Sequence, residues 1–434
     1  MSHPKSIAAK KIAIVNQYCD TIMPPVQNSV GACTYGIASR LATAAEVQVF
    51  GLIHDGGPTQ DFTDQGVRYR LLAASAPDLL LMRKFNRLAI LYRPFNDGMT
   101  IPRSAAAWVH PGYGRKVADE LARGAFDIVF FQHNSQYIPV VRRGNPHAKL
   151  VLNVHHELYP QCNHRLLARR FRHLDRVTAV SDFVAQQVAR CFPEIKPAPF
   201  TVSNGIETTE FEASPQRSET EAVSHRIMYA GAVSPEKGVH VLIEAFRIVA
   251  PHFPTARLDI FGAHSSRPLN EMFPQQGDPL LSELAPLYQG DYIAHLKNLL
   301  PEELGDRVAF RGNVPREELV RGYYEADVFA FPSLWNEGFG LPPIEAMAAG
   351  TPVVATRAGA MTETIEDGRT GILVDRNDPR ALADALLGLL QDRGKSSAMG
   401  QAARCKVLSE RTWDITATKL LKVFNSLMSG NAEP

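Results

Sequence analysis

The sequence predicts an α/β protein built from two Rossmann-like halves, with its binding site in the cleft between them. Short apolar runs alternate with helical patterns along almost the whole chain, and the alternation stops once at a polar stretch before it begins again. Ligands of parallel sheets bind beyond the carboxyl ends of the strands, so two facing halves would share one cleft. At 434 residues the chain is also too long for one ordinary domain.

The first half of the chain predicts one N-terminal domain over residues 1–205. Helix-like segments such as Thr34–Leu41 and Asp182–Arg190 separate apolar runs that have the length of buried strands. The expected strands are Ile12–Val15, Val47–Leu52, Ile128–Phe131, Leu150–Val154 and Val177–Val180.

The second half predicts a linker and then a second domain. Glu207–Ser224 is polar and acidic without an apolar period, which favours a linker over residues 206–224. A new alternation over residues 225–411 predicts the second domain, and an amphipathic pattern that starts at Trp413 predicts a last helix. The expected strands are Ile227–Ala230, Leu258–Phe261, Val308–Phe310, Val328–Phe331, Val353–Ala355 and Ile372–Val374.

Composition narrows the class of protein. The chain is 45% apolar and 21% charged, and its formal net charge of +1 gives no reason to expect a nucleic acid as partner. No apolar run is long enough for a signal peptide or a membrane span, so we expect a cytoplasmic protein. Scattered cysteines without metal-ligand spacing predict free thiols at Cys19, Cys33, Cys162, Cys191 and Cys405.

The segment from Glu337 to Gly350 carries the strongest chemical signal. It places two glutamates, Glu337 and Glu345, around a glycine-rich turn between an apolar run and a short helical pattern. Amides at a helix N-terminus favour an anion, and a turn with small side chains lets a phosphate approach. Because carboxylates accept hydrogen bonds from hydroxyl groups, the segment predicts a site for a nucleotide-sugar.

A second strand, glycine turn and helix occur together at Tyr229–Ala250. Lys237 lies just before the helical pattern, where a lysine beside free amides suits a diphosphate. Taken alone, Lys237 fits an exposed loop lysine equally well. Beside the glutamate segment, the diphosphate interpretation is favoured.

Four sequence blocks of the second half stand in a fixed order, and together they resemble glycosyltransferase family 4, the group 1 glycosyl transferases. The resemblance covers residues 201–430 most specifically and continues more weakly through the first half, at Asn153–His156, Ala179–Phe183 and Val202–Ile206. The four blocks are G-A-V-S-P-E-K-G (Gly231–Gly238), F-R-G-N-V (Phe310–Val314), P-S-L-W-N-E-G-F-G-L-P-P-I-E-A-M-A-A-G-T-P-V-V-A-T (Pro332–Thr356) and D-G-R-T-G-I-L-V (Asp367–Val374).

The resemblance implies a GT-B fold, which is two Rossmann-like domains facing across a cleft. Residues 1–205 would bind the acceptor and residues 225–411 the nucleotide-sugar donor. A C-terminal helix over residues 412–428 would pack back on the first domain. Family members are retaining enzymes that use nucleotide-sugars.

The resemblance also implies roles for single residues. Glu337 and His155 would be catalytic residues at the transferred sugar, Glu345 would bind the ribose hydroxyls, and Lys237 would neutralise the leaving diphosphate. Further donor contacts, largely from backbone at the turns, would come from Gly31, Gly231, Asn313, Val314, Gly338, Phe339, Gly340 and Leu341. His133 and His156 are further candidates on the acceptor or sugar side.

One position departs from the family pattern. The family usually has an arginine directly after the glycine at Gly231, and this chain has Ala232 there. One of the positive charges that share the diphosphate is therefore missing. An alternative function follows, a catalytically weak nucleotide-sugar-binding protein with the same fold. A GT-B sugar-nucleotide epimerase is disfavoured because Glu337, Glu345 and Lys237 recur as a set in the transferases.

The sequence thus predicts a retaining transferase that moves a hexose-type sugar from a nucleoside diphosphate sugar. UDP is favoured because UDP-sugars are the commonest donors in the family, and the acceptor would be a saccharide, a lipid-linked molecule or a small molecule. No Asp-x-Asp motif occurs in the chain, so we expect no metal and no other cofactor.

Two further segments allow more than one interpretation. Arg165–Arg176 holds five arginines and one acid, which favours a solvated helix face but also suits anionic lipid at the inner face of a membrane or a charged acceptor. The aromatic and basic run Ile90–Phe95 fits the lining of an acceptor cleft or ordinary core packing equally well.

Overall fold

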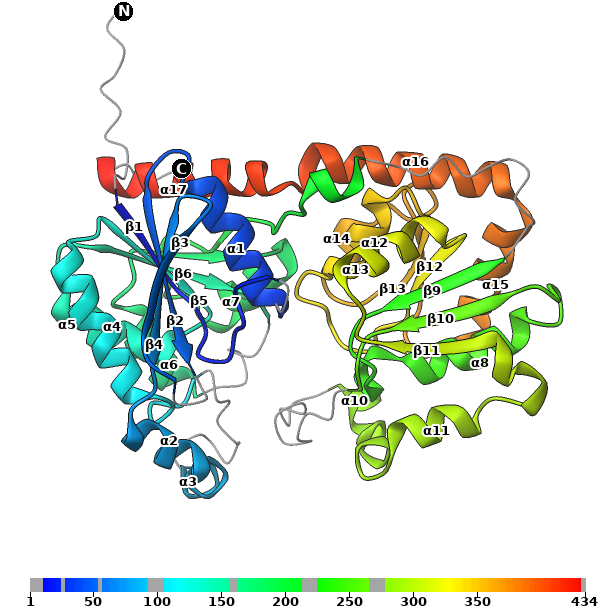
Figure 1. Ribbon diagram of the computed structural model, residues 1–434, viewed down its shortest axis with the longest axis horizontal. Coiled ribbons are helices and arrows are strands. Elements are labelled where there is room, and N and C mark those ends of the chain that lie inside the picture. The colour runs from blue at the N-terminus through cyan, green and yellow to red at the C-terminus, as the bar shows by residue number, and fades with distance from the viewer. Residues whose placement is uncertain are drawn as a thin grey trace, which may run out of the picture. The chain divides into compact units, whose positions relative to one another are not determined.

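The computed structural model describes residues 11–24, 28–53, 57–92, 105–156, 163–212, 225–264 and 278–430. The chain forms two compact units, each built on its own sheet (Figure 1). Unit 1 comprises residues 1–205 with 413–434, and unit 2 comprises residues 206–412. The predicted α/β class with two parallel sheets is confirmed.

The sheet of unit 1 has the order β3-β4-β2-β1-β5-β6-β7-β8, and all its neighbours are parallel except β3 and β4. Its strands are β1 (Lys11–Val15), β2 (Glu46–Ile53), β3 (Gln60–Asp64), β4 (Val67–Ala73), β5 (Ile128–Gln132), β6 (Lys149–Val154), β7 (Arg176–Ala179) and β8 (Phe200–Thr201). All five strands predicted here are confirmed. The sequence prediction missed β3 and β4 because their hairpin alternates polar and apolar residues at the edge of the sheet, and it missed β8 because β8 has two residues.

Helices cover the sheet of unit 1, and the last helix of the chain belongs to this unit (Figure 1). These elements are α1 (Ser29–Leu41), α2 (Ala76–Arg83), α3 (Phe85–Tyr92), α4 (Pro111–Gly124), η2 (Ser135–Tyr137), α5 (Ile138–Gly144), α6 (His164–Phe171), α7 (Asp182–Cys191) and α17 (Trp413–Ser429). The Trp413 ring packs directly on Gly36 of α1, where an added Cβ would lie 2.4 Å from the ring. The close approach of α17 to α1 therefore requires a glycine at that position.

The sheet of unit 2 is entirely parallel, in the order β11-β10-β9-β12-β13-β14. Its strands are β9 (Arg226–Ala230), β10 (Arg257–Phe261), β11 (Val308–Gly312), β12 (Val328–Phe331), β13 (Val353–Thr356) and β14 (Ile372–Val374). All six predicted strands are confirmed. This is the strand order of a doubly wound sheet. From β9 the chain adds β10 and β11 on one side, and then adds β12, β13 and β14 on the other side of β9.

Helices and short 3-10 turns connect the strands of unit 2 (Figure 1). They are η4 (Thr208–Phe211), η5 (Pro235–Lys237), α8 (Val239–Val249), α10 (Pro279–Glu283), η6 (Ala285–Tyr288), α11 (Tyr292–Asn298), η7 (Glu302–Arg307), α12 (Arg316–Glu325), α13 (Leu341–Ala348), α14 (Met361–Thr364), α15 (Pro379–Gln391) and α16 (Arg393–Glu410). Helices α13 and α16 approach so closely that a Cβ on Gly400 would lie 1.9 Å from the carbonyl oxygen of Gly350.

Within the predicted linker 206–224, residues 208–211 form η4 and Phe211 is fully buried; residues 213–224 lie outside the described residues. Two other sequence interpretations need correction. The five arginines do not share one solvated face, because Arg170 and Arg176 are buried. In the run Ile90–Phe95, Ile90 is exposed rather than part of the core, and residues 93–95 lie outside the described residues.

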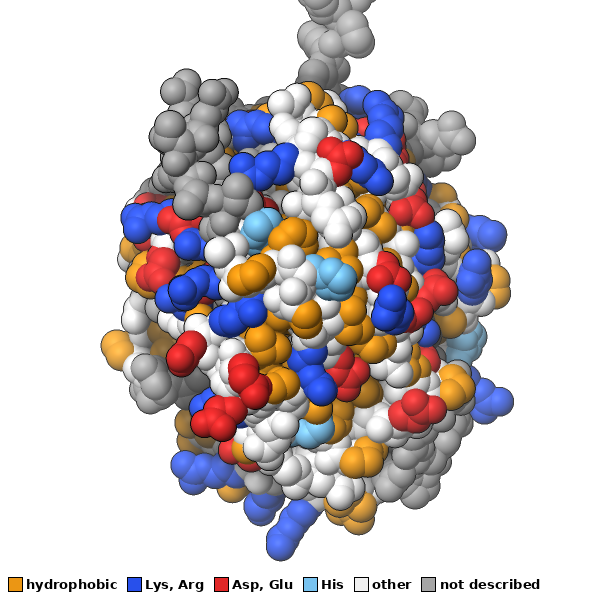
Figure 2. All heavy atoms as spheres, turned by 90° about the vertical axis from the view of Figure 1, so that its right-hand side faces the viewer, with side chains coloured by type: hydrophobic (Ala, Val, Ile, Leu, Met, Phe, Trp, Pro, Cys, Tyr) orange, Lys and Arg blue, Asp and Glu red, His pale blue; other side chains and the backbone are white. Residues whose placement is uncertain are grey.

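Acidic and basic side chains are interspersed on the face shown in Figure 2. Of the predicted thiols, Cys19, Cys33, Cys191 and Cys405 form no disulfide, and Cys162 lies outside the described residues. None of the helices in the described ranges is long and apolar enough to cross a membrane.

Candidate functional site

The predicted donor residues of unit 2 meet where the loops after β9 and β12 diverge. Lys237 ends η5 after β9, Glu337 lies in the loop after β12, and Lys237 Nζ is 2.6 Å from Glu337 Oε1. The hydroxyl of Ser333 donates to the same carboxylate oxygen over 2.6 Å. Both charged side chains are largely buried. Their ion pair holds the ammonium group of Lys237 at the carboxyl end of the sheet.

The two loops are also joined through their backbones. Gly238 adopts a φ of 70°, and a Cβ there would lie 2.0 Å from the carbonyl oxygen of Pro332. The carbonyl of Glu236 accepts hydrogen bonds from the amides of Leu334 and Trp335. These contacts fix the position of Lys237 relative to the second loop.

The glycine turn Gly338–Gly340 leads directly into helix α13. Gly340 adopts a φ of 82°, a left-handed conformation that glycine adopts without steric strain. Among the described residues, no side chain forms a capping hydrogen bond at the start of α13. Pro342 and Pro343 carry no amide hydrogen, so they cannot donate to a ligand. The donors that remain at this helix start are amides of the turn and of Leu341, which suits an anion in front of the turn.

Glu345 lies on α13, and both its oxygens have protein partners. Arg316 Nη2 is 2.8 Å from Oε1, and the hydroxyl of Tyr323 donates to Oε2 over 2.8 Å. Arg316 also binds Glu210 of η4, with Nη2 2.6 Å from Glu210 Oε2. Burial lowers the pKa of Arg316, but Glu345 and Glu210 raise it more, so the guanidinium stays charged.

The other predicted donor residues of unit 2 lie at the same edge of the sheet. The amide of Gly231 donates to the carbonyl of Phe261, and the carbonyl of Ala232 accepts a 2.7 Å hydrogen bond from the hydroxyl of Tyr229. After β11, Asn313 Oδ1 accepts a hydrogen bond from the amide of Ala263. The next residue, Val314, is half-buried.

In unit 1, the structure brings the three predicted histidines together at the carboxyl ends of β5 and β6. Nε2 of His155 lies 2.6 Å from Gln132 Oε1 and 3.3 Å from Asn153 Nδ2. The amide of His155 donates to Nδ1 of His133, and the rings of His133 and His156 have centroids 3.8 Å apart. His133 holds a left-handed backbone with φ of 61°, an unusual conformation for a residue with a side chain.

Burial decides the charge of these histidines. It lowers the pKa of His155 to about 4 and the pKa of His133 well below the ordinary value, in His133 with help from the neighbouring imidazoles. Both rings are therefore neutral near pH 7. They can exchange hydrogen bonds with a ligand but offer it no positive charge.

Gly31 lies in the first turn of α1. Its amide donates to the N-cap oxygen Oδ1 of Asn28 over 2.8 Å. A Cβ on Gly31 would lie 1.8 Å from the carbonyl oxygen of Thr21. Asn28 Nδ2 also donates to Asp20, and burial raises the pKa of that carboxyl to about 7.

Sequence reasoning missed several partners of the predicted residues. Gln132 ends an otherwise apolar strand directly before His133, and this polar position was a usable signal. Arg316, Tyr323 and Glu210 gave no such signal, because Arg316 and Tyr323 reach Glu345, and Glu210 reaches Arg316, only through the packing of α12 and η4.

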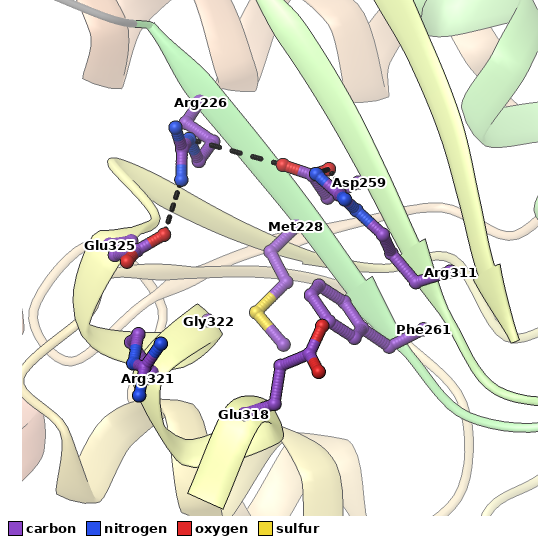
Figure 3. Close-up of a pocket in the computed structure, with 9 residues that line it drawn as sticks. All are labelled: Arg226, Met228, Asp259, Phe261, Arg311, Glu318, Arg321, Gly322 and Glu325. Carbon is purple, nitrogen blue, oxygen red and sulfur yellow. Dashed lines mark hydrogen bonds and ion pairs between the residues drawn. The ribbon is translucent and has the colours of Figure 1, made fainter. Parts of the chain in front are cut away.

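A charged pocket of about 170 Å³ lies elsewhere in unit 2, between α12 and the strands β9, β10 and β11 (Figure 3). Asp259 there pairs with Arg311 at 2.7 Å and lies 3.9 Å from Arg226 Nε. Apart from Arg311, which belongs to the F-R-G-N-V block, the residues that line this pocket include none of the predicted site residues. Within the described ranges, no group of three or more histidine, cysteine, aspartate or glutamate side chains could hold a metal ion.

Two family models match adjoining parts of the chain. The model of the glycosyl transferases group 1 matches residues 210–406, and the model of glycosyltransferase family 4 matches residues 34–210. Together the matches cover residues 34–406.

Individual proteins give the same result. The Bacillus subtilis protein YtcC is 27% identical over 333 residues, which cover 73% of this chain and 77% of YtcC. The D-inositol 3-phosphate glycosyltransferase of Corynebacterium urealyticum is 38% identical over 205 residues, 46% of this chain and 43% of that enzyme. The crystal structure of Anabaena Alr3699/HepE in complex with UDP and glucose has a TM-score of 0.67 at 17% identity, covering 96% of this chain and 100% of that one. This chain belongs to glycosyltransferase family 4, and it is a GT-B enzyme that transfers a sugar from a nucleotide-sugar.

Proposed function

We propose that this protein transfers a hexose-type sugar from a UDP-sugar to a hydroxyl of a saccharide, a lipid-linked molecule or a small molecule, with retention of configuration and without a metal. The observation that carries the proposal is the Lys237–Glu337 pair beside the glycine turn of α13. A diphosphate at that turn would meet amides, a helix N-terminus and a lysine together. The preference for UDP is supported by the UDP bound in the structurally similar Anabaena protein.

The roles of the two units follow from their chemistry. Unit 2 would hold the donor, with Glu345 on the ribose, Lys237 on the diphosphate and Glu337 at the sugar. Negative charge grows on the diphosphate as the sugar leaves, so Lys237 and the amides before α13 would bind the transition state more tightly than the ground state. The ion pair of Lys237 with Glu337 keeps that cation in place before the donor arrives.

Unit 1 would supply neutral hydrogen-bonding groups to the transferred sugar or the acceptor. His155 would lie at the reacting sugar, with His133 and His156 beside it. Buried amide atoms at the same edge, on Asn16, Gln17, Gln132 and Gln136, have no hydrogen-bond partner among the described residues. Buried polar groups are normally paired, and the hydroxyls of a sugar would pair them.

Ala232 supports a second candidate, a nucleotide-sugar-binding protein that transfers slowly. Loss of the usual arginine removes a cation from the diphosphate, which would reduce stabilisation of the leaving group more than binding of the intact donor. Isothermal titration combined with turnover assays separates the two candidates. Binding without sugar transfer or slow donor hydrolysis would favour the second.

The proposed function is tested by a thermal-shift screen against UDP-, GDP-, ADP- and TDP-sugars. A donor present at 100 times its dissociation constant stabilises the fold by about 2.7 kcal/mol, which is readily seen in a melting curve. The donor found in this way then serves in transfer assays with Lys237→Ala and Lys237→Arg. We expect Lys237→Ala to lower kcat by about 100-fold or more, and Lys237→Arg to retain part of the activity. Equal activity of Lys237→Ala and the unmodified enzyme would refute the placement of the diphosphate.

A further inference from the structure

The most exposed large apolar side chains of the described residues lie on two neighbouring helices of unit 1. Leu80 on α2 is 52% exposed, and Ile90 and Leu91 on α3 are 63% and 71% exposed. Single exposed apolar residues are common on protein surfaces, but here they fall within twelve consecutive positions of one helix pair. We call Leu80, Arg83, Lys84, Arg87, Ile90 and Leu91 the α2–α3 surface.

Helices α2 and α3 also pack against other parts of unit 1, so their exposed apolar residues do not result from a lack of packing. The carboxylate of Asp78 on α2 accepts hydrogen bonds from the amides of Gly112 and Tyr113 at the start of α4. On α3, Phe85 is buried and its ring centroid lies 6.1 Å from that of Trp108, while Tyr92 lies edge-on to the same ring at 5.0 Å. Both helices are thus anchored in unit 1, and the residues of the α2–α3 surface are exposed.

The charge of this surface has one sign. Arg83, Lys84 and Arg87 are exposed. Among the residues of these two helices, the single acid is Asp78, which is buried in its hydrogen bonds to α4. The α2–α3 surface therefore combines three basic groups with three apolar groups and no acidic side chain, which complements an anionic partner that has an apolar layer beneath its charges.

The surface also lies at the functional edge of unit 1. Helix α2 follows the carboxyl end of β4, and β4 runs parallel to β2, β1, β5 and β6. The carboxyl ends of β5 and β6 carry Gln132 and His155. In Figure 1, α2 and α3 lie beyond the carboxyl end of β4, at one end of unit 1. A partner on the α2–α3 surface would meet the edge where acceptor binding is proposed.

We propose that the α2–α3 surface docks this protein on a membrane that contains anionic phospholipid. Leu80, Ile90 and Leu91 enter the headgroup region, while Arg83, Lys84 and Arg87 stay at the level of the lipid phosphates. Binding of this kind is reversible, because each of the two helices inserts only a few side chains.

The arginine-rich helix α6 is the competing surface. Arg165, Arg169 and Arg172 are exposed there, so α6 offers the same number of basic groups. None of the large apolar side chains of α6 is exposed, since Leu167 and Phe171 are buried and Leu166 is half-buried. Salt screens charge attraction but does not screen the insertion of apolar groups. Salt should therefore weaken membrane binding through α6 more than binding through the α2–α3 surface.

The test uses the full chain and sedimentation with vesicles of phosphatidylcholine, with and without phosphatidylglycerol. We expect binding to the anionic vesicles only. Neutralising three basic groups in Arg83→Gln/Lys84→Gln/Arg87→Gln should weaken it on the order of a hundredfold, at about 1 kcal/mol for each group. Ile90→Glu/Leu91→Glu should abolish it. The matched control, Arg165→Gln/Arg169→Gln/Arg172→Gln, should bind as the unmodified chain does.

Each contrary result overturns the proposal. Equal vesicle binding by the α2–α3 variants would exclude this surface, and loss of binding in the α6 variant alone would move the contact to α6. A concentration-dependent dimer that Ile90→Glu/Leu91→Glu makes monomeric would mean that a second copy of the chain covers the surface. A melting temperature equal to that of the unmodified chain shows that each variant is folded, since the substitutions lie in unit 1. Absence of donor-induced thermal stabilisation in the unmodified chain would count against the proposed function and not against membrane docking.

Discussion

Arg316 Nη2 lies 2.8 Å from Glu345 Oε1 and 2.6 Å from Glu210 Oε2, so one guanidinium nitrogen joins the proposed ribose-binding glutamate to the first turn of unit 2. Tyr323 holds the second oxygen of Glu345. Each carboxylate oxygen has two acceptor positions, so these contacts orient Glu345 and still leave room for ribose hydroxyls.

Glu345→Ala should weaken donor binding. A hydrogen bond to a charged group contributes about 1.5–3 kcal/mol, so we expect a loss of affinity of about 10- to 100-fold. Isothermal titration with the donor identified by thermal shift measures this loss. Glu318→Ala is the matched control, because Glu318 is an exposed glutamate on α12. Unchanged affinity of Glu345→Ala would show that the ribose binds elsewhere.

Arg316→Met should raise the KM for the donor with little change in kcat, because Arg316 contacts Glu345, which is proposed to bind the ribose and not the reacting sugar. It should also reduce the free energy of unfolding by about 1–3 kcal/mol, less than for a fully buried pair because the guanidinium side chain is 35% exposed. Glu210→Gln should have a smaller effect on KM, since the Arg316–Glu345 contact remains. Steady-state kinetics would contradict this role if Arg316→Met lowered kcat alone.

Ala232→Arg should leave donor binding intact and tighten it by up to about tenfold, because a cation is added beside a diphosphate. The backbone at this position is held by the 2.7 Å hydrogen bond from Tyr229 to the carbonyl of Ala232. Ala232→Gln, which adds length without charge, is the control for steric effects. A large loss of affinity in Ala232→Arg alone would mean that another group already fills that space.

The buried histidine makes stability depend on pH in a defined window. The pKa of His155 is lowered from 6.5 to about 4 by burial, so between these values the unfolded chain binds a proton that the folded chain does not. Stability should fall as pH falls from 6.5 towards 4, and His155 should contribute about 3 kcal/mol of this loss.

Urea unfolding at pH 7.5 and pH 5 measures this effect. In His155→Gln the difference in free energy of unfolding between the two pH values should shrink, and the exposed His147→Gln is the control. Burial raises the pKa of Asp20 to about 7, and this carboxyl acts in the opposite direction equally in both variants. An unchanged difference in His155→Gln would mean that the pKa of His155 is not lowered in the folded protein.

Sugar transfer should persist in excess chelator. The sequence has no Asp-x-Asp motif, and Lys237 with the amides before α13 can balance the diphosphate charge in the place of a metal. The measurement is product formation before and after EDTA treatment. Loss of activity that magnesium restores would disprove metal independence.

The sequence predicted strands better than it predicted contacts. Strands such as Val328–Phe331 are continuous apolar runs buried on both faces, and that pattern is local, so periodicity alone identifies it. The hairpin β3–β4 was missed because one of its faces meets solvent and its apolar signal is diluted by half. Local pattern was also misleading in Arg165–Arg176, where Arg170 is buried and donates to the carbonyl of Ala105.

What the sequence by itself determined is the order of strands and helices, the two glycine turns, and the family to which they belong, because these depend on residues that are neighbours in the chain. Only the tertiary structure decided that Glu345 is held by Arg316 and Tyr323, that His155 is neutral against Gln132, and that α3 turns Ile90 and Leu91 to solvent. The physical reason is that hydrogen-bond partners, burial and the pKa of a buried group depend on which distant segments pack together.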